Sequence, residues 1–183
     1  HPTEPPRTGG RNPPSAPATQ AEPPPQVPAM NTDQLITLCH RASLELGLPD
    51  PFALGQGHTV TLDGVHVEIQ HKEPRPHFLL LAEIALFGAE QRAPVHERLL
   101  ALQLSTADHP NLRFGFHPLR KTTLLCLTAT PPSEEADGPA WLADLITATV
   151  AQVKEWREEL HSDTPPPTPK PSVLSPGGAA TWG

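Results

Sequence analysis

The sequence predicts an α+β fold, an antiparallel sheet with helices packed on it, in the order α-β-β-β-α-β-β-α. One amphipathic stretch at each end of the central region has the apolar spacing of a helix. Between them, two pairs of alternating segments have the two-residue period of strands, and an Asp-Gly turn joins the first pair. No internal repeat appears, so we expect one domain.

Proline divides the 183-residue chain into three parts. Ten of the 26 prolines lie in residues 1–29 and six in residues 162–183, and both segments contain almost no large apolar side chains. Such segments bury too little surface to offset the entropy of ordering them. We expect a disordered Pro-rich N-terminal extension at 1–29, a folded domain at 30–161 and a disordered Pro-rich tail at 162–183. Met30, the only methionine, leaves open whether residues 1–29 are native.

The net charge of −7 belongs to residues 30–161, which hold 17 acidic and 10 basic side chains. An acidic domain without a Lys/Arg cluster holds phosphates poorly, so we expect no nucleic-acid partner. No apolar run approaches 18 residues, and no basic segment followed by an apolar one opens the chain. We therefore expect a soluble cytoplasmic protein without membrane insertion.

The first helix is predicted to begin after Asn31, which can cap it together with Gln34, and to end at Gly47 and Pro49. Charged side chains occupy its outer face. The apolar residues that recur on its inner face are Leu35, Leu38, Cys39, Ala42 and Leu46.

A tight hairpin follows in the stretch GHTVTLDGVHVEIQH at 57–71. Asp63 and Gly64 tolerate the positive φ values of a two-residue turn. This turn fixes the register, opposing Leu62 to Val65, Thr61 to His66 and Val60 to Val67.

The three histidines of this hairpin raise the question of a metal or acid/base site. Alternation places His58 and His71 on the apolar side of the hairpin, whereas His66 and Glu68 lie on the polar side. His66 and Glu68 provide two ligands at most, and zinc needs three or four. We therefore interpret the hairpin as a structural element without a metal or acid/base site.

Two apolar segments come next. The run HFLLLAEIALF at 77–87 predicts a strand covered on both faces, because it is either central in the sheet or closed over by another chain, with a short helix as the alternative. A helix is predicted from Pro94 to about Ser105, with a stripe that Leu100 and Leu104 widen beyond one sheet face. Either a second protomer or ordinary core packing covers the excess.

The last elements are a second hairpin and a long helix. Leu112, Phe114 and Phe116 alternate with other residues ahead of a turn at 118–122 and a strand to residue 129. Gly115 indicates close approach of another backbone or a bulge. The final helix is predicted from Pro139 to Leu160.

No constellation of reactive groups emerges. HERLL at 96–100 has leucine where the second zinc ligand of the helix motif belongs, and GQG at 55–57 lacks the third glycine of a dinucleotide loop. Cys39 and Cys126 have no spaced partners and are interpreted as buried small hydrophobes. We expect a protein that is not an enzyme, with no catalytic residues, cofactor or metal.

Apolar surface is abundant instead, on the first helix, the hairpin, the third strand and the second helix. This exceeds what a domain of about 130 residues comfortably hides. The excess favours binding to protein, by dimerisation, by capture of an extended client, or by both.

Several stretches in this order resemble the Tir-chaperone family, the class I type III secretion chaperones. They are DQLITLCHRASLELGLPDP, HTVTLDGVHVEI, LLLAEIA, ERLLALQL, LRFGFHPLRKTTLLCL and AWLADLITATVAQVKEWREEL. The resemblance covers about residues 30–161. The segment LLALQLSTADHP and the Pro-rich tails depart from the family pattern.

The resemblance implies a bacterial, cytoplasmic, virulence-associated homodimer that holds the N-terminal region of a secreted effector in extended form. It implies a dimer interface on the second helix and fourth strand, at Val95, Leu99, Leu102, Phe114 and Phe116. It implies client binding by Leu35, Leu38, Leu46, Val60, Val65 and Val67. Most of these side chains also have a place in a core. Two alternatives stay open: a related dimeric adaptor for a folded partner, and a small hydrolase using His66 and Glu68.

Overall fold

The computed structural model describes residues 29–86, 88, 91–133 and 137–161. The elements are α1 (Thr32–Glu45), β1 (Val60–Leu62), β2 (Val65–His71), β3 (Phe78–Leu86), α2 (Arg92–Ser105), β4 (Leu112–His117), β5 (Thr122–Ala129) and α3 (Gly138–His161). This is the predicted order, and the predicted α+β class is confirmed. The segments expected to be disordered, 1–29 and 162–183, lie outside the described residues except for Ala29.

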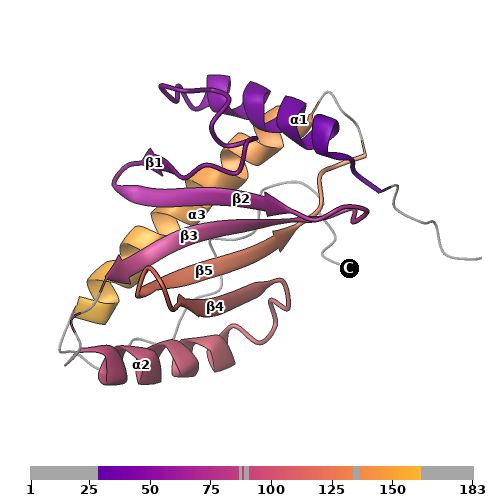
Figure 1. The fold of residues 1–183 in the computed structure, drawn as a ribbon. Coiled ribbons are helices and arrows are strands. Elements are labelled where there is room, and N and C mark those ends of the chain that lie inside the picture. The colour runs from indigo at the N-terminus through magenta and orange to yellow at the C-terminus, as the bar shows by residue number, and fades with distance from the viewer. Residues whose placement is uncertain (1–28, 87, 89–90, 134–136, 162–183) are drawn as a thin grey trace, which may run out of the picture.

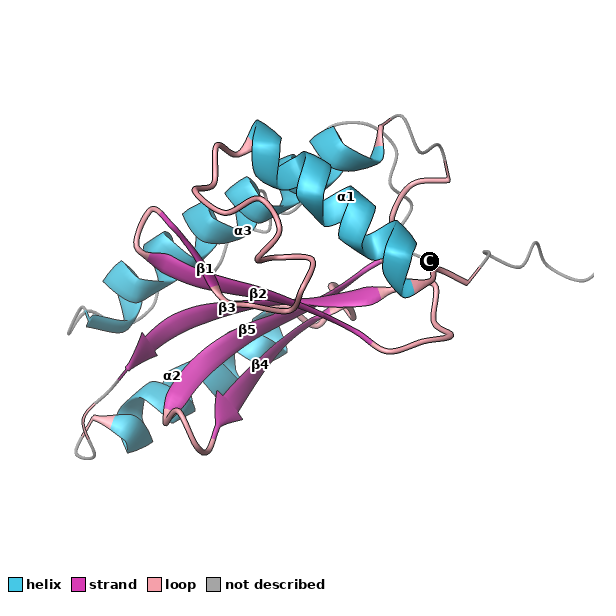
Figure 2. Cartoon of the chain, turned by 45° about the horizontal axis from the view of Figure 1, so that its top comes forward, coloured by secondary structure: helices cyan, strands magenta, loops and turns pink. Residues whose placement is uncertain are grey.

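The five strands form one antiparallel sheet in the order β1-β2-β3-β5-β4. α3 runs diagonally behind this sheet and α1 lies above it, so both helices cover the same face (Figure 1, Figure 2). α2 lies beside β4, at one edge. None of the helices in the described part of the chain covers the opposite face of the sheet.

α1 begins and ends as its sequence predicts. The Asn31 side chain accepts a hydrogen bond from the Gln34 N–H at 2.8 Å, and the Gln34 side chain accepts one from the Asn31 N–H at 2.9 Å. Gly47 follows the helix with φ +65°, a conformation that a side chain would strain.

The first hairpin has the predicted register, with Val60 opposite Val67 and Leu62 opposite Val65. Asp63 and Gly64 have φ values of 49° and 76°, as the two-residue turn requires. Register and turn together place Val65, Val67 and Ile69 on the covered face.

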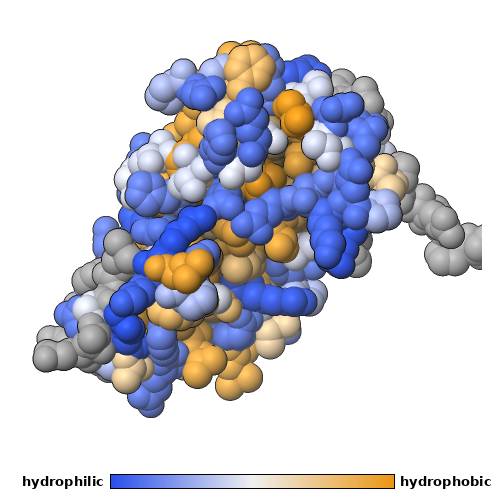
Figure 3. Space-filling model, viewed as in Figure 1, coloured by the Kyte–Doolittle hydropathy of each residue, from blue (hydrophilic) through white to orange (hydrophobic). Residues whose placement is uncertain are grey.

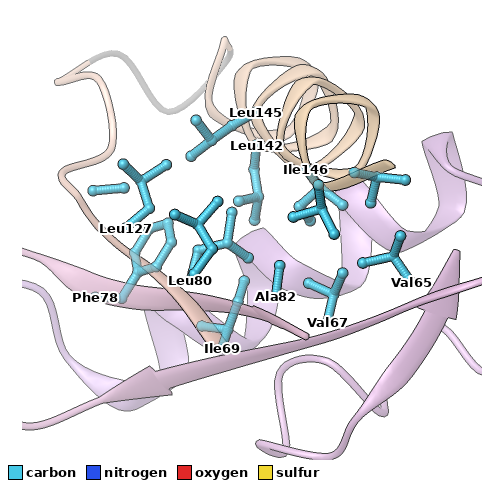
Figure 4. Close-up of a cluster of buried hydrophobic side chains, with 14 of the residues drawn as sticks. Val65, Val67, Ile69, Phe78, Leu80, Ala82, Leu127, Leu142, Leu145 and Ile146 are labelled. Carbon is cyan, nitrogen blue, oxygen red and sulfur yellow. The ribbon is translucent and has the colours of Figure 1, made fainter. Parts of the chain in front are cut away.

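The core lies between the covered face of the sheet and α3. β2 and β3 contribute Val67, Leu80 and neighbouring residues, which meet Leu142 and Ile146 from α3 (Figure 4). The buried face of α3 includes Leu142, Leu145, Ile146, Thr149, Val153, Trp156 and Leu160. Trp156 is a core residue whose ring meets Phe114 edge-on at 5.2 Å.

β3 is a central strand, so the helix alternative for residues 77–87 is wrong. Leu80, Ala82 and Ile84 are buried beneath the helices, but Leu79, on the other face, is 37% exposed. The expected cover on both faces is therefore wrong for the chain alone. The pairing of β3 with β5 shifts between Glu83 and Ala85, which marks a β-bulge.

Neither expectation for Gly115 holds among the residues that the structure describes. β4 pairs with β5 in regular register through this residue, and the sheet's irregularity lies in β3 instead. A Cβ at position 115 would meet the Cys126 Sγ at 3.5 Å, an ordinary contact.

No helix of the described part is both long and apolar enough to cross a membrane.

Candidate protein-binding surfaces

The chain presents three candidate surfaces. The first, the hairpin groove, lies between the end of α1, the β1–β2 turn and α3. The second, the α2 outer face, consists of Leu100 and Leu104 on α2 together with Phe116 and Leu119. The third is the helix-free face of the sheet, which we call the open sheet face.

The hairpin groove has a volume of about 550 Å³ and an apolar floor. Leu46 comes from the end of α1, Leu62 from β1 and Val150 from α3. Leu46 and Leu62 are partly buried and pack against the core. The groove is thus an extension of the core that reaches the surface.

The rim of this groove is acidic. Four carboxylates, Glu45, Asp63, Glu155 and Glu158, stand against the single ammonium group of Lys154. Lys154 approaches Asp63 at 4.0 Å, where both side chains are more than half exposed. An exposed pair of this kind contributes little to stability. With four carboxylates and one ammonium group among its lining residues, the rim has a net negative charge.

The groove adjoins the free edge of the sheet at β1. In a two-residue hairpin turn the flanking residues Leu62 and Val65 exchange backbone hydrogen bonds, so the N–H and C=O of Thr61 point away from β2. β1 has only three residues, which leaves a short edge that an extended chain can lengthen.

A second cavity, of about 510 Å³, opens at the other end of α1. Leu38 and Met30 line it together with the segment that leads into α3. Leu38 packs tightly here, since a Cβ on Gly138 would come within 3.1 Å of its Cδ1.

The six predicted client-binding residues are thus divided. Leu35, Val65 and Val67 lie in the core of the single chain. Leu46 lines the hairpin groove, Leu38 lines the second cavity, and Val60 is partly buried on β1 beside the groove. Client binding by all six stays a prediction; the partly buried three are the ones at a surface.

The five predicted dimer residues are divided in the same way. Val95 and Leu99 are buried, where α2 packs on its own chain. Leu102 and Phe114 are partly buried against the core. Phe116 is 41% exposed, and its ring meets the His96 ring at 5.4 Å. Their role in dimerisation is a prediction that the single chain does not test.

The α2 outer face consists mainly of residues outside that prediction. Leu100 is 71% exposed and Leu104 is 78% exposed, four residues apart on one side of α2. Leu119, in the β4–β5 turn, is 88% exposed. Hydrophobic surface is visible over α2 in Figure 3. The unusual width of the apolar stripe on α2 was the sequence feature that indicated Leu100 and Leu104 as surface residues. No sequence feature indicated Leu119.

The open sheet face carries a hydrogen-bonded cluster around Glu68. The Arg120 guanidinium reaches across the sheet and donates to Glu68 Oε2 at 2.8 Å, and the Gln70 amide donates to Oε1 at 2.7 Å. The Thr59 hydroxyl adds a longer contact of 3.4 Å. Burial alone raises the pKa of Glu68, but these hydrogen bonds and the Arg120 charge outweigh it and lower the pKa.

This cluster is poorly arranged for hydrolysis. Both Glu68 oxygens are occupied, and a lowered pKa makes the carboxylate a weak base. His66 lies on the same face, but its Nδ1 pairs with the Thr61 hydroxyl at 2.9 Å. Within the described residues, no group of three or more His, Cys, Asp or Glu side chains is placed to hold a metal ion.

The two cysteines are free thiols, as predicted, and Cys39 is fully buried. Burial raises the pKa of Cys39 to about 12, so its thiol stays protonated. Burial also raises the pKa of the partly buried Cys126, against the opposing charge of Arg113.

Comparison with known proteins establishes the fold. No protein family matches the sequence, and no curated protein matches it. Among solved structures, a chain in the crystal structure of the ExsC–ExsE complex aligns with 73% of this chain and 98% of its own length. The TM-score is 0.51 and the sequence identity is 20%. The two chains share the α+β fold, and membership of the Tir-chaperone family stays a prediction.

Proposed function

We propose that this protein is a non-enzymatic chaperone that holds the N-terminal region of a type III secreted effector in extended form, keeping it soluble and competent for secretion. The hairpin groove carries this proposal, because an apolar floor lies beside a free strand edge within an acidic rim. The fold that this chain shares with a chain of the ExsC–ExsE complex, in which two proteins are bound together, supports a role in binding another protein.

The groove favours a particular kind of segment. Backbone pairing with β1 would hold a client strand, and alternate side chains of that strand would enter the groove between Leu46 and Leu62. Basic residues in the segment would meet the carboxylates of the rim. Binding therefore weakens as the salt concentration rises.

The chain acts as a homodimer in this proposal. The α2 outer face supplies an apolar surface that the chain leaves uncovered, and a second copy covers it by presenting the same face. Cytoplasmic location in a bacterium and a role in virulence belong to the same proposal. The α+β adaptor for a folded partner remains the alternative, because it would use the same surfaces.

Co-expression of the full chain with the protein encoded beside its gene tests the proposal. We expect a stable complex in which protease cleaves the bound partner segment less readily than the same partner alone, and in which that segment has no fold of its own. Leu46→Gln removes an apolar residue from the groove and should weaken the complex about tenfold or more.

Leu44→Gln is the matched control for this experiment. Leu44 is an exposed leucine two residues earlier on α1 and does not line the groove. A partner that is fully folded when bound would support the adaptor. Equal weakening of the complex by the two substitutions would show that the groove is not the binding site.

A further inference from the structure

The two edge strands of the sheet differ in whether their outward backbone groups are hydrogen-bonded within the chain. β1 and β4 are the outer strands, and the outer strand of a sheet exposes backbone groups that can pair with another chain. The Thr128 N–H donates to the Asn111 carbonyl at 2.8 Å, so alternate residues from 111 onward direct their backbone groups toward β5. Leu112, Phe114 and Phe116 consequently direct theirs outward.

A side chain of α2 occupies the first part of this outer edge. The Gln103 Nε2 donates to the Leu112 carbonyl at 3.2 Å, and the Gln103 Oε1 accepts from the Phe114 N–H at 2.9 Å. The Leu112 N–H donates to the His109 carbonyl at 3.0 Å. The outward groups of β4 from the Leu112 N–H to the Phe114 N–H are therefore all paired within the chain.

The glutamine amide suits this position because it carries one acceptor and two donors in a plane, like a peptide group. Its place is fixed by the rest of α2. Val95 and Leu99 are buried in the core, and Arg98 Nη1 donates to the Leu160 carbonyl at the end of α3 at 3.2 Å. These contacts fix α2 in the turns that precede Gln103, and so hold Gln103 against the strand.

We infer that the side-chain amide of Gln103 takes the hydrogen bonds that an added strand would make along the first part of the β4 edge, and so directs an added strand to β1. The closure of β4 stands on the hydrogen bonds above. The direction of a client to β1 rests on the proposed function. Gln103 is a positioning residue here, because it acts on the edge and has no contact with the groove.

Amide hydrogen exchange of the full chain tests the closure without any client. The Phe114 and Phe116 amides both face outward on the same strand, but only the former has an acceptor among the described residues. We expect slow exchange at Phe114, and fast exchange at Phe116 when the chain is dilute enough to be monomeric, because the proposed dimer face includes Phe116. Gln103→Met keeps a similar side-chain length without hydrogen bonds, and should accelerate exchange at Phe114 by about tenfold or more.

Gln91→Met is the control, because Gln91 precedes α2 and its exposed side chain makes no capping hydrogen bond. Fast exchange at Phe114 in the unchanged chain, or no acceleration in Gln103→Met, would overturn the inference. If Gln103→Met does not fold, the contrast between Phe114 and Phe116 in the unchanged chain decides the question.

A strand probe tests the consequence. A synthetic peptide with the sequence of residues 111–117 should shift the amide resonances of Phe114 and Phe116 in Gln103→Met and leave those of the unchanged chain in place. Equal shifts in both proteins would contradict closure by Gln103. In the co-expressed complex, protection of the Thr61 amide reports client addition at β1, so failure of the proposed function would leave the Phe114 results standing.

Discussion

At the scale of single residues, Arg157 connects α3 to two separated parts of the sheet. Its guanidinium donates to the carbonyl of Ile84, and to that of Glu83 at 2.8 Å, where the bulge of β3 interrupts the pairing with β5. A further donor reaches the Gly64 carbonyl in the first hairpin turn at 2.9 Å. Arginine suits this task because its donors lie in one rigid plane.

Arg157→Met keeps the aliphatic stem of this side chain and leaves the three carbonyls without their donor. We expect the free energy of unfolding to fall by about 2 kcal/mol, because hydrogen bonds to charged groups are worth more than neutral ones. Urea denaturation checks this as a lower midpoint with an unchanged slope. Arg41→Met, at an exposed position of α1, should change stability by less than about 0.5 kcal/mol. Equal losses would refute the special role of Arg157.

Glu68 makes stability depend on pH. Folding lowers its pKa, so its contribution is complete above the unfolded value of about 4.3 and is lost as the pH falls through the lower folded value. The coupling between Glu68→Gln and Arg120→Gln in a double-mutant cycle should be about 1 kcal/mol or less at pH 7, because Arg120 is partly exposed. Urea denaturation at successively lower pH should show this coupling shrinking as the Glu68 carboxylate becomes protonated. Coupling that does not change with pH would contradict the ionic origin.

At the scale of elements, one side of α2 packs on the core of its own chain, and another side is exposed to solvent. Val95 and Leu99 face the core, whereas Leu100 and Leu104 face solvent. Exposed apolar pairs of this kind are candidates for an interface, and Phe116 and Leu119 are further exposed apolar residues of the chain.

The double substitution Leu100→Glu with Leu104→Lys should convert the proposed dimer to a monomer. The new pair has the favourable order of charges four residues apart, so the helix itself should be retained. Sedimentation velocity measures the mass, and circular dichroism confirms the helix content. Ala101→Glu, at an exposed position on the same helix, should leave the mass unchanged. A monomeric unchanged protein would refute the dimer.

Elements governed by local rules were predictable from the sequence. The cap of α1 at Asn31 and the register set by Asp63 and Gly64 depend on neighbours in the chain, so residue types alone indicate them. Gln103 and Arg157 bind backbone groups of other elements, and nothing in their own surroundings signals this. Which apolar stripe residues stay exposed depends on how the elements pack, so the sequence alone could not tell which of the predicted site residues lie at the surface.

At the scale of the whole molecule, the helices cover one face of the sheet, and apolar side chains reach the surface at the hairpin groove and on α2. The groove is acidic and lies beside β1, which is a short edge strand, while Gln103 occupies the first part of the opposite edge. These features together favour one route for an added strand. They also separate the proposed client site from the proposed dimer face, so a dimer can hold client chains at two grooves.

Amide hydrogen exchange of the bound partner, in the complex of the full chain with its co-expressed client, tests the central claim most directly. Because an added strand pairs through every second residue, we predict alternating protection along one segment of the client, together with new protection at Thr61 of this chain. The remaining amides of that client region should exchange as in an unfolded chain. Uniform protection typical of a folded client domain, with Thr61 unchanged, would contradict the account.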